Sequence, residues 1–308
     1  MSLSFSIITP SYNQGQFIER TILSVLQQSD VEYEYRVQDG GSSDLTLDIL
    51  RKYQDKIQWV SEKDEGQADA VNRGILASTG DIIAWLNSDD VYYPSALKKV
   101  GHIFEAYPNV QVVYGRAHHI DQNDNVIDSY PTEKWNFSRL KEICFICQPA
   151  TFFRRQLVET HGALDSQLKF CMDYELWLRY GQHTQFFFLP EVLAGSRLYA
   201  TNKTLGQRVA VHHEINDMMK KKFGISPEKW VIAYASVLIK EQEKSEYKTS
   251  GRLKIYARQV SEFYTEAFRS YCRWRDLKVT PRTFWRIFRW TAASLYHQFR
   301  PKPRNHSL

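Results

Sequence analysis

The segment Gly80-Asp-Ile-Ile-Ala-Trp-Leu-Asn-Ser-Asp-Asp90 decides the fold of this chain. Residues 82–86 are all apolar, which is typical of a strand that is buried on both faces of a sheet. Polar and acidic residues follow at once, at 87–90. In an α/β sheet, ligands bind beyond the carboxyl ends of the strands. The segment therefore predicts a buried strand that delivers carboxylates to a ligand-binding edge.

The sequence on either side of this segment alternates short apolar runs with helical patterns. Strands are expected at 5–9, 33–37, 57–60, 81–86 and 110–114, and helices at 16–28, 44–53, 67–78 and 94–107. This rhythm predicts an α/β fold with a mostly parallel sheet and helices on both faces. Residues 121–197 mix short strands and helices, and the pattern beyond residue 202 is nearly all helix.

The composition excludes several classes of protein. The chain has 308 residues, of which 43% are hydrophobic and 24% charged, so it is not disordered. A mean hydropathy of −0.47 is too polar for a polytopic membrane protein. The N-terminus has no basic segment of the signal-peptide kind, and the four cysteines are too few for a disulfide scaffold. We therefore expect a cytoplasmic protein of about two domains with reduced thiols.

Polar clusters follow four successive strands, at residues 9–13, 39–44, 62–66 and 87–90. Because parallel strands end at one edge of a sheet, the four clusters are expected to form one site. No Gly-x-Gly-x-x-Gly follows the first strand, so a dinucleotide fingerprint is absent. Pro10 and Tyr12 could form a rigid surface on which a nucleobase stacks. Asn13 could form hydrogen bonds with the edge of that nucleobase, and Asp39 could accept a hydrogen bond from one of its N–H groups. Taken alone, Asp39 and the two glycines after it are more simply a tight turn.

The carboxylates at 87–90 suit a hard divalent cation. One or two carboxylates suffice for Mg²⁺ or Mn²⁺ when a diphosphate completes the coordination shell. The cation would then neutralise a leaving diphosphate. The alternative is an acidic loop that caps the helix beginning at Pro94, which would account for Asp90 alone.

These motifs, in this order and at this spacing, resemble family 2 glycosyltransferases of the GT-A fold. The resemblance covers residues 5–204 and rests on Thr9-Pro-Ser-Tyr-Asn13, Asp39-Gly-Gly-Ser-Ser-Asp44, Asp64-x-Gly-Gln-x-x-Ala-x-Asn72 and Trp85-Leu-Asn-Ser-Asp-Asp90. It implies an inverting sugar transfer from a nucleoside-diphosphate donor, usually UDP-linked, with Mn²⁺ or Mg²⁺. It also implies a catalytic domain at 1–204, with a nucleotide-binding half at 1–120 and an acceptor-side half at 121–204. A helical region at 205–308 follows.

The resemblance also implies roles for individual residues. The nucleoside would be held by Thr9, Pro10, Tyr12, Asn13 and Asp39, and the ribose and donor sugar would lie near Asp64, Gly66 and Gln67. Asn87-Ser88-Asp89 would be the family's Asp-x-Asp element, with Asp89 as the metal ligand. Asn87 departs from the usual acid there, and its missing charge is expected to weaken metal binding. Gln148 would contact the acceptor, and Arg197 would neutralise the diphosphate.

The general base is expected in the segment Cys171-Met-Asp-Tyr-Glu-Leu-Trp-Leu-Arg179, which resembles the family's Glu-Asp-x-x-Leu-x-x-Arg. Asp173 falls at the catalytic aspartate, while Met172 replaces the acid before it. Asp173 shares a helix face with apolar residues at i+3, i+4 and i+7, and partial desolvation there would raise its pKa. The simpler alternative is an acid that stabilises the helix dipole, a role that suits Glu175 better.

The last 42 residues form a basic, aromatic tail. From Ala267 to Leu308 there are ten Lys or Arg, one acid and nine aromatic residues. Aromatic residues interleaved with arginines favour an interfacial segment on anionic lipid. A helix docked on the protein itself is an equally weighted alternative, and nucleic acid is not expected as a partner. The lipid alternative would place the protein on the cytoplasmic face of the inner membrane.

These observations together predict a glycosyltransferase of surface-polysaccharide assembly that acts on a saccharide or lipid-linked acceptor. Two alternatives remain open at this stage. A sugar nucleotidyltransferase shares the sheet and the nucleotide chemistry, but it should carry a Gly-rich phosphate loop after the first strand. A catalytically impaired nucleotide-sugar-binding protein would explain the departures at Asn87, Met172 and Tyr199.

Overall fold

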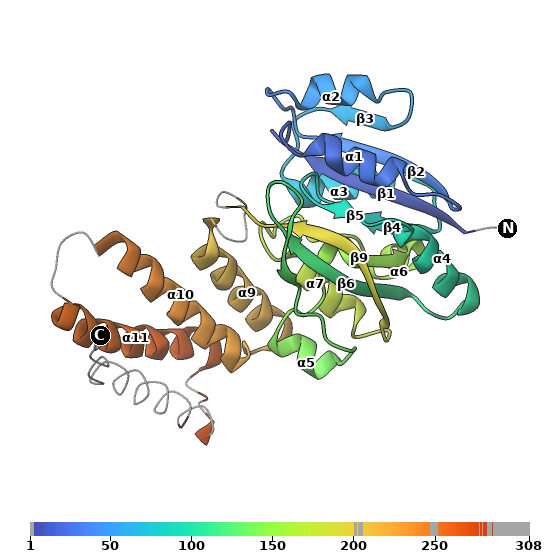
Figure 1. The fold of residues 1–308 in the computed structure, drawn as a ribbon. Coiled ribbons are helices and arrows are strands. Elements are labelled where there is room, and N and C mark those ends of the chain that lie inside the picture. Colours follow the sequence, from blue (N-terminus) through green and yellow to red (C-terminus); the bar gives the residue numbers. More distant parts are fainter. Residues whose placement is uncertain are drawn as a thin grey trace, which may run out of the picture. The chain divides into compact units, whose positions relative to one another are not determined.

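The structure is a computed structural model that describes residues 3–199, 202, 206–246, 252–276, 278, 280, 281 and 285. The chain forms two compact units, Met1–Gln207 and Arg208–Leu308 (Figure 1). Each unit is described by itself.

The first unit is built on a single mixed sheet. Among the described residues the sheet has nine strands, in the spatial order β3-β2-β1-β4-β8-β6-β9-β5, with β7 paired to β6. The strands are β1 (Ser4–Ser11), β2 (Glu32–Asp39), β3 (Gln58–Ser61), β4 (Ile82–Trp85), β5 (Val91–Tyr92), β6 (Val112–Ile120), β7 (Val126–Ser129), β8 (Thr151–Arg154) and β9 (Phe187–Arg197). Pairing is parallel from β3 through β2 and β1 to β4 and between β6 and β9, and antiparallel elsewhere.

Helices connect these strands in the βαβ manner. They are α1 (Ile18–Leu26), α2 (Thr46–Lys52), α3 (Gln67–Leu76), α4 (Ala96–Ala106), α5 (Phe137–Glu142), the 3₁₀ turn η1 (Gln148–Ala150), α6 (Arg155–His161) and α7 (Met172–Tyr180). The predicted α/β fold and its parallel first four strands are confirmed. The helix expected from Pro94 begins at Ala96, because Ser95 takes a left-handed conformation with φ of 62°.

Helices α1 and α3 lie on opposite faces of the sheet. Successive side chains of a strand point to opposite faces, so Ile7 and Ile8 of β1 separate. Ile7 joins the buried cluster that contains Ile22 of α1. Ile8 lies against Gly74 of α3, where a Cβ would come within 2.5 Å of the Ile8 methyl. The chain therefore changes face between β3 and β4, and such a change creates the crevice where α/β sheets bind ligands.

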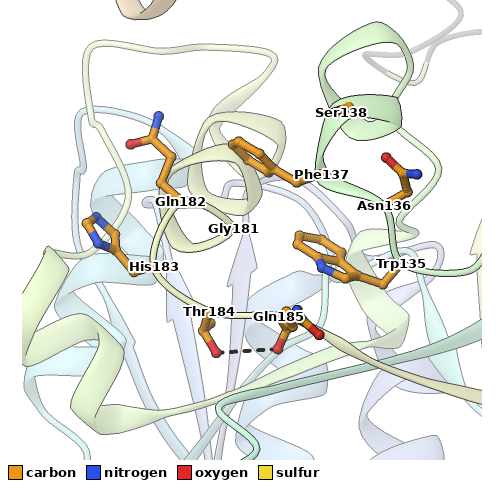
Figure 2. A pocket seen from close by; sticks show the side chains of 9 residues that line it. All are labelled: Trp135, Asn136, Phe137, Ser138, Gly181, Gln182, His183, Thr184 and Gln185. Carbon is orange, nitrogen blue, oxygen red and sulfur yellow. Dashed lines mark hydrogen bonds between the residues drawn. The ribbon is translucent and has the colours of Figure 1, made fainter.

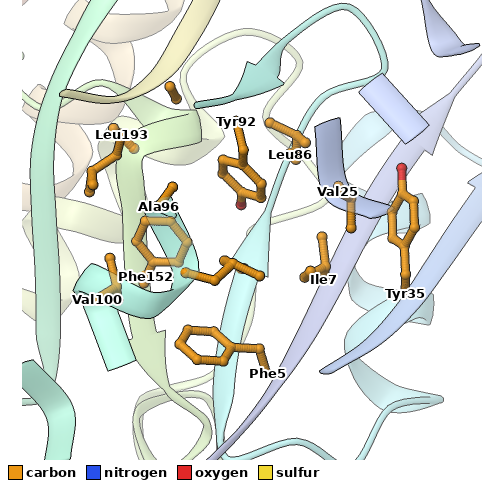
Figure 3. Packing of buried hydrophobic residues seen from close by; sticks show 14 of the residues in the cluster. Phe5, Ile7, Val25, Tyr35, Leu86, Tyr92, Ala96, Val100, Phe152 and Leu193 are labelled. Carbon is orange, nitrogen blue, oxygen red and sulfur yellow. The ribbon is translucent and has the colours of Figure 1, made fainter. Parts of the chain in front are cut away.

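A cluster of buried hydrophobic residues forms a core on the α1 side of the sheet (Figure 3). Phe152 of β8 packs its edge against Phe5 and stacks on Tyr92, with ring centroids 6.4 Å and 5.7 Å apart. All three rings are buried. This packing fixes β4 and β5 on either side of the polar loop at 87–90.

The second unit is helical, as predicted. It contains α9 (Arg208–Phe223), α10 (Glu228–Glu246) and α11 (Arg252–Arg275). Trp274, at the start of the basic tail, is 1% exposed, and its Nε1–H donates to Asp217 at 2.7 Å. Its ring packs edge-on against Tyr234, with the centroids 4.9 Å apart.

The tail therefore begins inside this unit. Arg275 is also buried and donates to the carbonyl of Ser226, whereas Trp285 is 61% exposed. Residues 277, 279, 282–284 and 286–308, which include the tail's remaining arginines and aromatic residues, lie outside the described residues. Within the part of the chain that the structure describes, none of the helices combines the length and apolar character needed to cross a membrane.

Candidate active site

The carboxyl ends of β1, β2 and β3 meet in register, as the sequence predicts. Ser11 pairs with Asp39, and Asp39 pairs with Ser61. The backbone continues this alignment beyond the strands, because Gly40 N–H donates to the Ser11 carbonyl at 2.8 Å. Three of the four predicted clusters thus begin side by side.

Asp39 holds its own loop together. Its carboxylate is 2% exposed and accepts from the backbone N–H groups of Gly41 and Ser42 and from the hydroxyls of Ser42 and Ser61. Asn13 then ties the first loop to this one, because its Oδ1 accepts from the Ser43 N–H at 2.9 Å. The structure therefore brings the loops of Asp39 and Asn13 together at this edge of the sheet, as one wall of the candidate site.

The remaining residues of the first loop differ in exposure. The Tyr12 ring is 63% exposed, whereas Thr9 and Pro10 are buried at the end of β1. The Thr9 hydroxyl is within hydrogen-bond distance, 3.1 Å, of the Tyr35 hydroxyl in the interior. Of the residues expected to hold a nucleoside, Tyr12 and Asn13 are exposed, and Tyr12 offers the aromatic surface.

Asp64 joins this wall from the end of β3. A Cβ on Gly40 would lie 2.7 Å from Asp64 Oδ2, so the carboxylate rests directly against the glycine backbone. Its Oδ1 accepts from the Gly66 N–H at 2.8 Å, just before Gln67 begins α3. Any side chain at position 40 would displace Asp64.

Asn87 is the centre of a hydrogen-bond network beyond β4. Its Oδ1 accepts from Gln67 Nε2 at 2.7 Å and from Trp85 Nε1 at 2.8 Å. Its Nδ2 donates to Gln148 Oε1 at 2.9 Å and more weakly to Asp90 Oδ2 at 3.3 Å. Gln148 Nε2 in turn donates to the Trp85 carbonyl at 2.5 Å.

The network explains the departure at position 87 from the family's usual acid. An asparagine amide has two donor hydrogens and one acceptor oxygen, and here all of them are used. An aspartate would have no hydrogen to offer the Gln148 and Asp90 oxygens. Asn87 therefore links Gln67 at the start of α3 to Gln148 of η1, and its amide is turned toward the protein.

Asp89 is the half-buried carboxylate of this loop. The Tyr199 hydroxyl donates to Asp89 Oδ2 at 3.0 Å. Burial raises the pKa of Tyr199, and the nearby charge of Asp89 raises it further, so the phenol keeps its proton. The neighbouring Asp90 is fully buried and accepts from the Arg197 N–H at 2.9 Å, and burial together with the charge of Asp89 raises its pKa. Of the two acids, only Asp89 is open to a ligand.

Arg197 stands in a different setting from the one expected for a diphosphate contact. Its side chain is fully buried, and its guanidinium stacks over the Phe17 ring at 4.8 Å. It donates to the carbonyls of Asp89 and Asp121 and pairs with the Asp124 carboxylate. These contacts fix the backbone of the loop that carries Asp89. In this structure Arg197 therefore stabilises that loop.

Asp173 lies in the first turn of α7 and is half-buried. Burial raises the pKa of the Cys147 thiol well above its usual value, and the charges of Asp90 and Asp173 raise it further. Asp173 likewise raises the pKa of the Cys144 thiol, after burial, which is the larger cause. Cys144 and Cys147 therefore both lie near Asp173, and Cys147 also lies near Asp90. Gln148 follows Cys147 directly in the chain.

Glu175 is buried in an ion pair that stabilises the fold. It is 6% exposed and forms an ion pair with Arg179 at 2.8 Å, one turn along α7. The Arg179 guanidinium also donates to the carbonyls of residues 161, 162 and 163. The pair anchors the loop after α6, and the assignment of the general base to Asp173 stays a prediction.

Two further residues support the loop at 87–90 and are not predictable from the sequence. The Thr21 hydroxyl of α1 donates to the carbonyls of Ser88 and Asp90 at 2.9 Å and 2.8 Å, and so fixes the loop from the core. Asp124, in the turn before β7, neutralises Arg197. Both act across 67 or more residues of sequence, and neither sits in a motif, so only the fold reveals them.

Residues 6–162, half of the chain, match the family described as Glycosyl transferase family 2. The chain belongs to this family. It is 32% identical to a glycosyltransferase of Rickettsia prowazekii over 218 aligned residues. The alignment covers 66% of this chain and 67% of that protein. It is 24% identical over 232 residues to chondroitin synthase of Escherichia coli, covering 73% of this chain and 34% of that one. The protein is therefore a glycosyltransferase.

Solved structures agree on the fold. S. aureus TarS 1–349 in complex with UDP-GlcNAc has a TM-score of 0.58 at 15% identity, covering 86% of this chain and 82% of that one. The mannosyltransferase PcManGT of Pyrobaculum calidifontis, in complex with GDP-Man and Mn²⁺, has a TM-score of 0.51 at 16% identity, covering 95% and 80%. At these identities the likeness establishes the architecture of this glycosyltransferase.

Proposed function

We propose that this glycosyltransferase performs an inverting transfer from a nucleoside-diphosphate sugar to a hydroxyl of a saccharide or lipid-linked acceptor. One observation carries the proposal: the Asn87 amide, in the same loop as the half-buried Asp89, joins Gln67 at the start of α3 to Gln148. A residue expected near the donor sugar and one expected near the acceptor therefore meet at one acidic loop. Family membership favours sugar transfer over nucleotidyl transfer.

The nucleoside of the donor would lie on the wall formed by the first two loops. Tyr12 supplies an exposed ring for stacking, and Asp39 and Asn13 hold the wall rigid. The Ser11 hydroxyl, beside Asp39, is buried without a hydrogen-bond partner in the described part of the chain, which suits a polar ligand there. Solved neighbours contain UDP, UDP-GlcNAc or GDP-Man. We take UDP as the first nucleotide to test.

The residues fit a divalent metal held mainly by its substrate. No group of three or more His, Cys, Asp or Glu side chains suited to a metal occurs among the described residues. Asp89 alone offers hard carboxylate oxygens at the open edge of the loop, and Mg²⁺ or Mn²⁺ is commonly held by one carboxylate plus phosphate oxygens. When bound, the cation would neutralise the diphosphate as it leaves. Tyr199, through its hydrogen bond, orients the Asp89 carboxylate for this contact.

Asp173 would act as the general base. Its carboxylate takes the proton from the acceptor hydroxyl while the acceptor oxygen bonds to the anomeric carbon. The bond from that carbon to the diphosphate oxygen breaks at the same time, on the opposite face of the sugar, so the configuration inverts. Gln148, which follows Cys147 in the chain, would contact the acceptor.

Asp173→Asn tests this assignment. Transfer should fall by about 10²–10⁴-fold, the usual loss when a general base is removed, while UDP-sugar affinity stays near the wild-type value. Glu175→Gln is the matched control, because it removes the other acid of the same helix and should retain most of the transfer. An Asp173→Asn variant that keeps its transfer rate would place the base elsewhere. A wild-type protein that neither transfers nor hydrolyses any UDP- or GDP-sugar would instead favour the binding-protein alternative.

We further propose a role in surface-polysaccharide assembly at the cytoplasmic face of a membrane. The likeness to a chondroitin synthase supports a polysaccharide product. The nine net positive charges from residue 267 onward would support attachment to anionic lipid, at about 1 kcal/mol for each basic residue near the surface. Trp274 and Arg275 are packed inside the second unit, so such a contact would be made by exposed residues of the tail such as Phe268 and Arg269 and by residues after 276.

A further inference from the structure

A pocket of about 570 Å³ lies at the C-terminal end of α7, away from the loop of Asp89 (Figure 2). Its walls come from the start of α5 and from the turn that joins α7 to β9. The lining residues are Trp135, Asn136, Phe137, Ser138, Gly181, Gln182, His183, Thr184 and Gln185. The proposed mechanism uses none of them.

One wall of the pocket is a fixed aromatic surface. The Trp135 ring stacks on the buried Phe186 ring, with centroids 4.2 Å apart and planes 16° from parallel. Phe137 lies beside it at 6.4 Å. A Cβ on Gly181 would come within 2.8 Å of the Trp135 ring and 2.9 Å of the Phe137 ring. Both rings therefore lie directly on the end of α7, and both remain partly exposed.

The rim of the pocket is polar. None of the nine lining residues carries a carboxylate, ammonium or guanidinium group, and the nearby Lys141 ammonium is engaged over the Phe137 ring, 5.3 Å from its centroid. Figure 2 shows Gln182 and His183 across from Trp135, with Thr184 and Gln185 between them. Asn136, Gln182, His183 and Gln185 are exposed. Amide, imidazole and hydroxyl groups can both donate and accept hydrogen bonds, as the hydroxyls of a sugar require. A phosphate or carboxylate ligand would call for Arg or Lys instead.

We propose that this pocket binds a neutral saccharide unit of the acceptor chain. The aliphatic C–H face of a pyranose ring packs on an aromatic face, and its hydroxyls reach the polar rim. The inference rests on the proposed function, because it supposes a saccharide acceptor. Asp173 and Gly181 stand at opposite ends of α7, eight residues or about 12 Å apart. A sugar in the pocket would therefore be an internal unit of the acceptor, and the reacting unit would lie at Asp173.

Direct binding tests the inference without donor or metal. The probes are chitotetraose, mannotetraose and maltotetraose, observed by saturation-transfer NMR and by tryptophan fluorescence. At least one should bind saturably, and Trp135→Ala should weaken that binding by about tenfold, the size of a lost aromatic contact. Trp285→Ala, which removes another exposed tryptophan, is the matched control and should change nothing. If none of the three binds, or if Trp135→Ala binds as wild type does, the pocket is not a saccharide site.

Two further measurements distinguish loss of saccharide binding from misfolding of the Trp135→Ala variant and from failure of the proposed function. The double variant Gln182→Ala, Gln185→Ala removes exposed rim groups without touching the packed rings, and it should also weaken binding by several-fold. In transfer assays, the Trp135→Ala variant should raise KM for the bound tetrasaccharide and leave donor hydrolysis unchanged. An unchanged KM would overturn the acceptor role. Failure of the wild type to use any sugar donor would count against the proposed function and leave the binding result intact.

Discussion

Replacing Asn87 by Asp should reverse the hydrogen-bonding polarity at the centre of the candidate active site. In the wild type, Asn87 Nδ2 donates to Gln148 Oε1 at 2.9 Å and to Asp90 Oδ2 at 3.3 Å. An ionised carboxylate has no donor, so each contact would set one acceptor against another. Gln148 cannot turn its amide over freely, because its Nε2 already donates to the Trp85 carbonyl.

The cost follows from the spacing of the groups. Two carboxylates about 3.5 Å apart repel by about 5 kcal/mol at an effective dielectric constant near 20. The variant can avoid this repulsion by keeping a proton on one of the two carboxyls, which costs about 1.4 kcal/mol per pH unit above the pKa of that carboxyl. Because burial and the charge of Asp89 already raise the pKa of Asp90, the proton is held there at a smaller cost than on an ordinary aspartate. We therefore expect Asn87→Asp to lower the free energy of unfolding at pH 7 by about 1–3 kcal/mol, the usual cost of mismatched buried polar groups.

The loss should depend on pH with a definite sign. The pKa of the carboxyl that keeps the proton is raised in the folded state above its unfolded value, so the folded state holds a proton that the unfolded state has released. Stability relative to the wild type therefore falls as pH rises, by up to about 1.4 kcal/mol per unit from about pH 4 until the raised folded pKa is passed. Near pH 4 the variant should approach the wild type.

Denaturant unfolding at pH 5, 6 and 7 measures this difference. Asn109→Asp, in the exposed turn before β6, adds the same charge away from the network and should change stability by less than about 0.5 kcal/mol. Adding Asp90→Asn to Asn87→Asp restores a donor between the two positions and should recover part of the loss. An Asn87→Asp variant as stable as wild type at pH 7, or one that binds Mn²⁺ more tightly, would refute the inward-facing amide.

Three further outcomes are expected. Asp89→Ala should abolish the enhancement of UDP binding by Mn²⁺, measured by titration calorimetry with and without the metal, and an unchanged enhancement would remove Asp89 as the ligand. Glu175→Gln should lower the free energy of unfolding by about 2–3 kcal/mol, because it leaves the half-buried charge of Arg179 without its partner; an unchanged denaturant midpoint would contradict the structural role. Neutralising Arg282, Arg286 and Arg289 together should weaken cosedimentation with anionic vesicles at low salt. A wild-type protein that does not cosediment with these vesicles would refute the membrane proposal.

The sheet and the polar loops at its edge could be predicted because the sequence patterns that indicate them lie within short stretches of neighbouring residues. Apolar runs of four to eight residues separated by helical patterns require only neighbouring residues to be recognised. The strand at 81–86 and the loops after residues 9, 39 and 61 were found in this way. The antiparallel pairing of β8 with β4 and β6 is not predictable from the sequence, because partners 37 or more residues apart leave no periodic trace in one sequence.

The supporting contacts of the site could not be predicted for a related reason. A motif shows that position 87 carries an amide where the family usually has an acid. It does not show that Gln67, Trp85 and Gln148 surround that amide. Arg197 looked like a cation for phosphate because its motif position lies near the site, and only the fold reveals that Asp124 and Phe17 enclose it.

The same contacts suggest why this loop can carry two acids and an asparagine. Arg197 supports the Asp89 backbone from below, Tyr199 donates to its carboxylate, and Asn87 donates to Asp90. Each donor offsets part of the repulsion between adjacent carboxylates, which would otherwise be greatest before a cation arrives. If position 87 were a third acid, the loop would depend on a bound metal for its shape. With an amide there, the protein itself can fix the loop, and a cation would enter a site that is already formed.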